Sequence, residues 1–180
     1  MAYVWNQRAA MAGLLLAMAF SACKSGQNVK VEEQGDESAP RIASMVHTGD
    51  PKSESQLLSG FYGIEQNAWR WTAQQFSVAL RPPAGAAQKG ATLNVQLAVP
   101  DVTINQLKTV TLSAGTGSVA LAPETYTQSG SFTYTRDVPA SQLTGDSVRL
   151  DFHLDKALPP SASDKRELGL IVSSIALDAK

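Results

Sequence analysis

Residues 91–99 read ATLNVQLAV, and their pattern decides the fold. Every second side chain is apolar, at Leu93, Val95, Leu97 and Val99, and the positions between them hold mainly polar residues. Because successive side chains of a β-strand point to opposite faces, this alternation is typical of a strand with one face in a core and one in solvent. The stretch therefore predicts a half-buried β-strand.

The same alternation recurs in several segments that follow residue 56. It is clear at 148–154, where apolar residues alternate with charged residues and with His153, which we therefore expect on a solvated outer face. Further segments of this kind lie at 76–80, 110–112, 119–121, 132–134 and 171–177. Clusters rich in Gly, Pro and Ser, such as 81–85 and 113–117, separate them and indicate turns.

Roughly eight or nine short strands with no helix between them predict an all-β fold of two packed sheets. We expect a single antiparallel β-sandwich at 57–180, of the jelly-roll or immunoglobulin-like kind. The number of strands favours the jelly roll, whereas the connectivity does not follow from the alternation. A chain of 180 residues is long enough for one well-packed core.

The first 22 residues have the layout of a signal peptide. A short stretch with one positive charge, Arg8, precedes the apolar run 9–20 and the small residues Ser21 and Ala22. The run is shorter than the roughly 20 apolar residues that a membrane-spanning helix needs. Residues 1–22 are therefore predicted to be a cleaved leader.

Phe20-Ser21-Ala22-Cys23 resembles the lipobox of bacterial lipoproteins, although leucine is commoner than Phe20 at the first position. The resemblance implies cleavage by signal peptidase II, lipidation of Cys23 with diacylglycerol and fatty acids such as palmitate, and attachment to a membrane. Several acyl chains hold a protein on a bilayer stably, whereas one chain binds marginally. The alternative is an ordinary secretory signal that leaves Cys23, the only cysteine, as a free thiol.

A lipid-anchored chain of this kind faces the periplasm or the exterior from the cell membrane or the outer membrane. Lys24 stands where an aspartate would favour retention on the inner membrane, so the outer membrane is favoured. Residues 23–56 are rich in Ser, Gly, Glu, Lys and Pro and show no sustained apolar period, which predicts a flexible, disordered linker. The alternative is that part of 42–46 docks on the domain as an edge strand.

Composition excludes several classes of function. The formal net charge of -1 gives no basic footprint for nucleic acid. The only histidines, His47 and His153, do not have the spacing of a zinc site with the single cysteine. No nucleophile motif or phosphate-binding loop is present, so we expect neither an enzyme nor a cofactor or metal.

Two charged and aromatic stretches stand apart from the strands: GFYGIE at 60–65 followed by WRWT at 69–72, and DKRELGL at 164–170. If the first and last strands meet, an arginine, Arg70 or Arg166, can hold the carboxylate of Glu65 or Asp164 as a structural ion pair.

The aromatic residues of these stretches also suggest a binding surface. Tyr62, Trp69 and Trp71 can form a platform for the apolar faces of sugar rings, with Arg70 bonding sugar hydroxyls. Trp69 and Trp71 share one face of a strand, so the alternative is that both belong to the core.

These motifs resemble the flanks of a small β-sandwich module of bacterial cell-surface and glycan-assembly proteins, over residues 58–177. The resemblance implies a fold more firmly than a function. The sequence therefore predicts a membrane-anchored, non-enzymatic module that binds or organises envelope components, with a glycan or an envelope protein as partner. The alternative is a carbohydrate-binding module that acts in glycan assembly or recognition.

Overall fold

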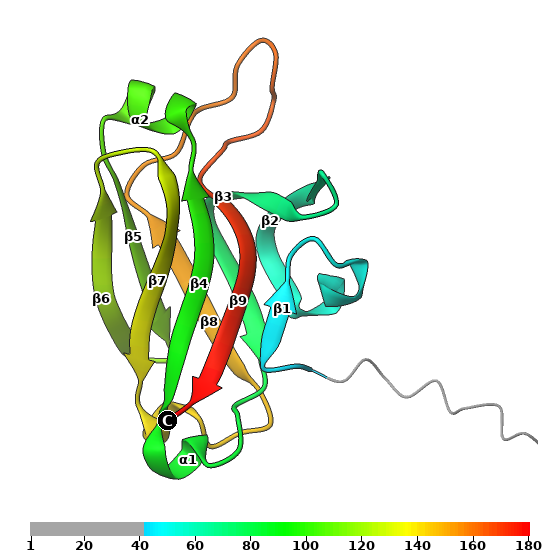
Figure 1. Cartoon of the computed structure of the whole chain (residues 1–180), viewed down its shortest axis with the longest axis vertical. Helices are drawn as coiled ribbons and strands as arrows, with labels where there is room; N and C mark the ends of the chain where they lie inside the picture. Colours follow the sequence, from blue (N-terminus) through cyan, green and yellow to red (C-terminus); the bar gives the residue numbers. More distant parts are fainter. Residues whose placement is uncertain (1–41) are drawn as a thin grey trace, which may run out of the picture. The chain divides into compact units, whose positions relative to one another are not determined.

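The computed structural model describes residues 42–180 (Figure 1). The predicted leader 1–22, the lipidation site Cys23 and the linker up to residue 41 lie outside the described residues. None of the helices in the described part of the chain is long and apolar enough to cross a membrane.

Nine strands make up most of the described chain. They are β1 (Met45–His47), β2 (Leu57–Glu65), β3 (Trp69–Leu80), β4 (Ala91–Val99), β5 (Val110–Thr116), β6 (Val119–Tyr126), β7 (Gly130–Val138), β8 (Val148–Leu154) and β9 (Ile171–Ala179). The structure adds short helical segments that the alternation did not predict. They are the 3-10 turns η1 (Pro51–Gln56) and η2 (Ala140–Gln142) and the helices α1 (Ala86–Lys89) and α2 (Asp101–Leu107).

The strands pack as two layers, which confirms the predicted antiparallel β-sandwich (Figure 1). One layer has the order β6-β5-β8-β3-β2, and the other has the order β7-β4-β9-β1. Strand β3 belongs to both layers, because Arg70 and Trp71 pair with β9 and residues 75–80 pair with β8. Because β3 pairs with strands of both layers, hydrogen bonding is continuous through the nine strands. All of the pairings are antiparallel.

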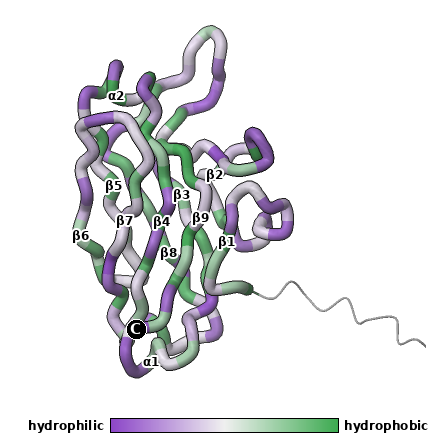
Figure 2. Tube along the Cα trace, in the orientation of Figure 1, coloured by the Kyte–Doolittle hydropathy of each residue, from purple (hydrophilic) through white to green (hydrophobic). Residues whose placement is uncertain are grey.

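The core lies between the layers and holds the side chains that the alternation placed inward. Figure 2 shows hydrophobic and hydrophilic residues alternating along the strands. Leu93, Val95 and Leu150 are fully buried. Phe76 of β3 stacks on Phe152 of β8, with ring centroids 4.7 Å apart. Burial of such apolar surface is the main stabilising contribution to a fold of this size.

The folded unit begins upstream of residue 57, which corrects the predicted boundary between linker and domain. Strand β1 pairs with β9, and Val46 is 1% exposed. The Gln56 side chain accepts a hydrogen bond from the backbone N–H of Ala43 and donates to the carbonyl of Ala79. The edge strand considered as an alternative is therefore present. Strand β1 has three residues with a single buried side chain, too few for the alternation to indicate a strand.

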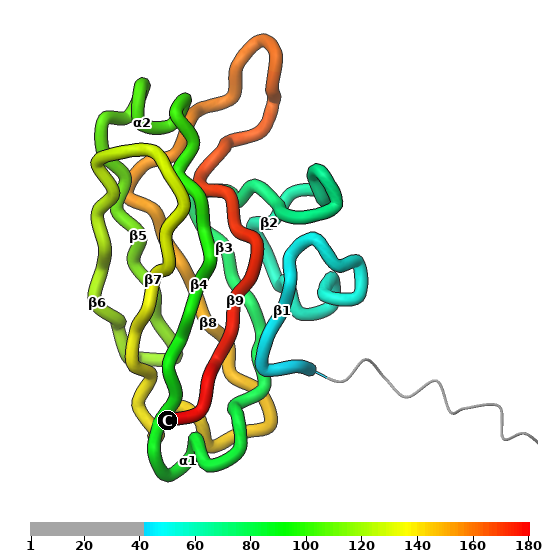
Figure 3. Tube along the Cα trace, viewed as in Figure 1, coloured from blue at the N-terminus to red at the C-terminus, as the bar shows by residue number. Residues whose placement is uncertain are grey.

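Arg136 closes the sandwich where the edge strands of the two layers, β6 and β7, lie side by side (Figure 3). Its guanidinium donates hydrogen bonds to the carbonyls of Ala122 and Pro123 and pairs with Glu124 at 2.9 Å. It also lies over the Tyr134 ring, 4.1 Å from the centroid. These contacts supply hydrogen-bond donors to backbone carbonyls of β6, and Tyr134 Oη also donates to the Ala122 carbonyl, at 2.8 Å.

Candidate functional site

The outer face of the β7-β4-β9 layer carries a row of side chains that starts at a tryptophan. Trp71 pairs with Ile171, Ile171 pairs with Ala98, and Ala98 pairs with Ser131, so the row crosses four strands from β3 to β7. Because side chains at paired positions lie on the same face of a sheet, these four residues are neighbours.

A groove of about 410 Å³ lies on this face. Its lining consists of Trp69, Gln96, Leu97, Ala98, Ser131, Ile171 and Ser173. Ser173 is the extra residue of a bulge in β9, because the register shifts where Gln96 pairs with Ser174 and Leu97 pairs with Val172. Bulges redirect side chains locally and occur often next to binding sites.

Amide and hydroxyl groups continue along the same face beyond the groove. Gln96 Oε1 accepts a hydrogen bond from Thr133 Oγ1 at 3.0 Å, and Asn94 Oδ1 accepts one from Thr135 Oγ1 at 2.7 Å. These bonds fix the orientation of both amides. Among the described residues, Gln96 Nε2 donates no hydrogen bond, so it remains able to donate to a ligand.

The two tryptophans that the sequence places on one face differ in exposure. Trp69 is half-buried and lines the groove, whereas Trp71 is 9% exposed and does not line it. The edge of one ring faces the other, with centroids 6.4 Å apart. Trp69 is thus the aromatic side chain available to a ligand, and Trp71 supports it.

Arg70 is not available to a ligand on this face. It alternates with Trp69 and Trp71 along β3 and is 5% exposed. Its Nε donates to the carbonyl of Thr48 at 2.8 Å, its Nη1 donates to the carbonyl of Tyr62 at 3.0 Å, and its Nη2 pairs with Glu54. Arg70 therefore holds the η1 region and β2 against β3, and the sequence-based candidate for hydroxyl binding is corrected to a structural residue.

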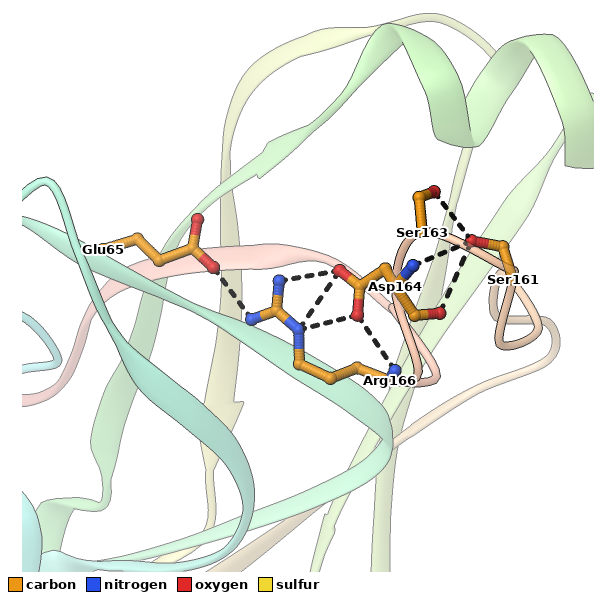
Figure 4. Close-up of polar contacts among 5 residues, drawn as sticks. All are labelled: Glu65, Ser161, Ser163, Asp164 and Arg166. Carbon is orange, nitrogen blue, oxygen red and sulfur yellow. Dashed lines mark hydrogen bonds and ion pairs between the residues drawn. The ribbon is translucent and has the colours of Figure 1, made fainter.

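Arg166 joins the two charged stretches (Figure 4). Its Nη1 donates to Glu65 Oε1 at 2.8 Å, and its Nε and Nη2 donate to the Asp164 carboxylate at 3.0 and 2.8 Å. The guanidinium carbon lies 5.3 Å from the centroid of the Tyr62 ring. Tyr62 therefore belongs to this ion-pair cluster, and it does not line the groove beside Trp69.

The side chain of Arg166 and its backbone N–H both donate to Asp164, and these hydrogen bonds lower the pKa of the Asp164 carboxyl to about 2. The pKa of Arg166 is raised because Asp164 and Glu65 accept its hydrogen bonds. Asp164 and Arg166 consequently stay ionised at neutral and mildly acidic pH. The ion pairs of Arg166 with Asp164 and Glu65 attach the 155–170 loop to β2.

Close packing at the end of this loop explains why residue 169 is a glycine. Gly169 donates its N–H to the carbonyl of Thr72 at 2.7 Å. A Cβ atom at Gly169 would lie 2.8 Å from the carbonyl oxygen of Ala73 and 2.6 Å from a methyl group of Leu154. Only glycine lets the loop approach β3 this closely.

Sequence reasoning identified Trp69 but missed the residues that surround it. Gln96 points outward because of the alternation along β4, and Ser173 is the bulge residue of β9. That both lie near Trp69 depends on the β3-β9-β4 strand order, which the sequence does not show. Within residues 42–180, no group of three or more His, Cys, Asp or Glu side chains is placed to hold a metal ion.

No protein-family model matches the chain, and no curated protein matches it. Solved structures are similar to it, among them the following two. One is a carbohydrate-binding module, TmCBM27, described for specific mannan recognition, with 12% identity, a TM-score of 0.44, and coverage of 77% of this chain and 98% of that chain. The other is a CBM4 structure, with 14% identity, a TM-score of 0.31, and coverage of 79% of this chain and 86% of that chain. At these identities and TM-scores, neither similarity identifies a binding residue in this chain.

Proposed function

We propose that this domain binds a glycan in the groove beside Trp69. The observation that carries the proposal is the half-buried Trp69 ring next to uncharged amide and hydroxyl groups on one open sheet face. A pyranose ring has an apolar face of C–H groups and an edge of hydroxyls. An aromatic ring accommodates the face, and polar side chains such as Gln96 and Ser173 bond the edge.

The chemistry of the groove favours a neutral sugar. None of the described side chains that line it is charged. An acidic sugar would lose hydration there without gaining an ionic partner, which costs free energy. Asn94 and Gln96 on β4 and Thr133 on the neighbouring β7 extend the polar surface beyond the groove, which suits a chain of several sugar units.

Replacement of Trp69 with alanine is expected to weaken glycan binding by at least roughly tenfold, because aromatic anchors contribute about 2 kcal/mol or more. The measurement is binding to an array of neutral oligosaccharides, followed by calorimetric titration with whichever oligosaccharide is bound. Trp69→Phe serves as the control, since it keeps a ring and should retain most of the affinity. Equal binding by the wild type and Trp69→Ala, or no binding by the wild type, contradicts the proposal.

We also propose that the domain acts in the bacterial envelope, held on the outer membrane by lipid on Cys23. The support is the lipobox-like sequence and the position of the single cysteine directly after an apolar leader. Such an anchor leaves the groove to recognise glycans at the membrane surface.

Cys23→Ser is expected to abolish metabolic labelling of the protein with a fatty acid, because serine has no thiol to form the thioether. The measurement is incorporation of an alkyne-tagged palmitate, together with fractionation of the membranes. Labelling that persists in Cys23→Ser, or that is absent from the wild type, contradicts the anchor.

A further inference from the structure

A second hollow, of about 450 Å³, lies on the outer face of the other layer, over β2, β3, β8 and β5. It does not share a lining residue with the groove beside Trp69. Its polar lining includes Ser77, Ser113, Arg149, Asp151 and His153. The alternation of β8 predicts this outer face, but it does not predict a hollow there.

The strand register explains the hollow. One row across the layer consists of Ser59, Ser77, Asp151 and Gly115, because each pairs with the next. Three of these residues have small side chains or none, and the Ser59 and Ser77 hydroxyls are hydrogen-bonded to each other at 2.8 Å. Asp151 therefore stands in a row of small residues, with the Ser77 hydroxyl on one side and Gly115 on the other.

Asp151 retains unused capacity as a hydrogen-bond acceptor. Arg149 makes both of its contacts with the same carboxylate oxygen, Oδ1, at 2.8 Å through Nε and at 2.8 Å through Nη2. In the described part of the chain, Oδ2 accepts no hydrogen bond. The side chains of Arg149 and Asp151 are 61% and 54% exposed, so this pair contributes little to stability.

The neighbouring row adds donors and acceptors. Gln75 pairs with His153, and His153 pairs with Ser113. Gln75 and His153 are exposed and line the hollow, and among the described residues neither side chain has a hydrogen-bond partner. An amide, an imidazole and a hydroxyl thus face solvent next to the free oxygen of Asp151.

The hollow does not offer an aromatic platform. Phe76 and Phe152 line it, but they are 2% and 3% exposed and stack on each other. It does not favour an anion either, because Asp151 compensates the charge of Arg149. The ligand that fits this set is neutral and rich in hydroxyls.

We propose that this hollow is a second sugar-binding surface, which holds a neutral pyranose through hydrogen bonds alone. Asp151 Oδ2 accepts from one hydroxyl or from two adjacent hydroxyls of the ring. Arg149, Gln75 and His153 contribute further bonds at the rim. The two surfaces lie on opposite layers, so each binds its sugar independently of the other.

The test is a titration of the isotope-labelled chain, carrying Cys23→Ser to prevent lipidation, with methyl glycosides of glucose, galactose, mannose and fucose. The backbone amide signals of Ser77, Ser113 and Asp151 are expected to shift in a saturable manner with at least one glycoside. Asp151→Asn is expected to weaken this binding roughly tenfold, because a hydrogen bond to a charged acceptor is replaced by one to a neutral acceptor.

Two controls separate this surface from the groove. Asp146→Asn removes the same charge from an exposed loop position outside the hollow and should leave the binding unchanged. Trp69→Ala should leave it unchanged as well. Absence of saturable shifts at Ser77, Ser113 and Asp151, or equal affinity in Asp151→Asn, overturns the second surface. Shifts confined to the residues around Trp69 would support the proposed function and overturn the second surface. Shifts confined to the residues around Asp151 would support the second surface and contradict glycan binding in the groove.

Discussion

Trp71→Ala is expected to lower the free energy of unfolding by about 3 to 5 kcal/mol, the usual range for truncation of a buried large aromatic side chain. Trp71 is 9% exposed, and its ring packs edge-on against Trp69 at the point where β3 pairs with β9. Alanine would leave a cavity where β3 passes from one layer to the other. The measurement is denaturant unfolding followed by circular dichroism and fluorescence.

The neighbour Trp69 provides a matched comparison, since it is the same residue type on the same face of β3. Trp69 is only half-buried, so Trp69→Ala should cost markedly less stability than Trp71→Ala. We therefore expect Trp71→Ala mainly to lower stability and Trp69→Ala mainly to weaken glycan binding. A mild effect of Trp71→Ala would contradict the expectation that the ring is tightly packed against Trp69 and β9.

The strands and the core follow from the sequence because their signal is local. Leu93, Val95 and Leu97 on β4 and Leu150 on β8 occupy every second position, and the structure buries each of them. A half-buried strand imposes this pattern whatever its neighbours are. Fold class was therefore predictable, whereas the order of strands depends on contacts between distant segments.

The site could not be predicted in full for the same reason. Trp69 and Trp71 have identical positions in the alternation, yet Trp69 is half-buried and lines the groove, whereas Trp71 is 9% exposed, a difference that the local pattern does not indicate. Gln96 is one of many outward polar residues, and nothing in its local sequence distinguishes it. The hollow at Asp151 depends on Gly115, which comes from another strand.

For the two arginines of the charged stretches, residue type predicted an ion pair but not which arginine forms it. Both were candidates for pairing with Glu65 or Asp164. Arg166 makes both ion pairs, whereas Arg70 is directed to backbone carbonyls and to Glu54. The choice depends on which side of β3 the η1 segment packs, and η1 lies in a stretch whose composition resembles a linker.

Arg70→Met is expected to lower the free energy of unfolding by about 3 kcal/mol, because a buried polar group that loses its partner costs about 1 to 3 kcal/mol. The substitution keeps an apolar stem but leaves the carbonyls of Thr48 and Tyr62 without their donor. Thr48 is fully buried, so water cannot replace the lost bond there without opening the structure. Arg149→Met is the matched control, since Arg149 pairs on an exposed face and its removal should cost about 1 kcal/mol or less.

A second comparison shows which contacts of Arg70 contribute to the free energy of unfolding. Glu54 is 68% exposed, and Glu54→Gln should therefore cost about 1 kcal/mol or less, although it removes the charge that Arg70 faces. Arg70→Lys should behave like Arg70→Met, because one ammonium group cannot reach both carbonyls in the geometry of the guanidinium fork. Chemical unfolding of the four variants measures these differences. If Glu54→Gln were as unstable as Arg70→Met, the ion pair with Glu54 would provide the stabilisation. The explanation based on the hydrogen bonds to the two carbonyls would then be wrong.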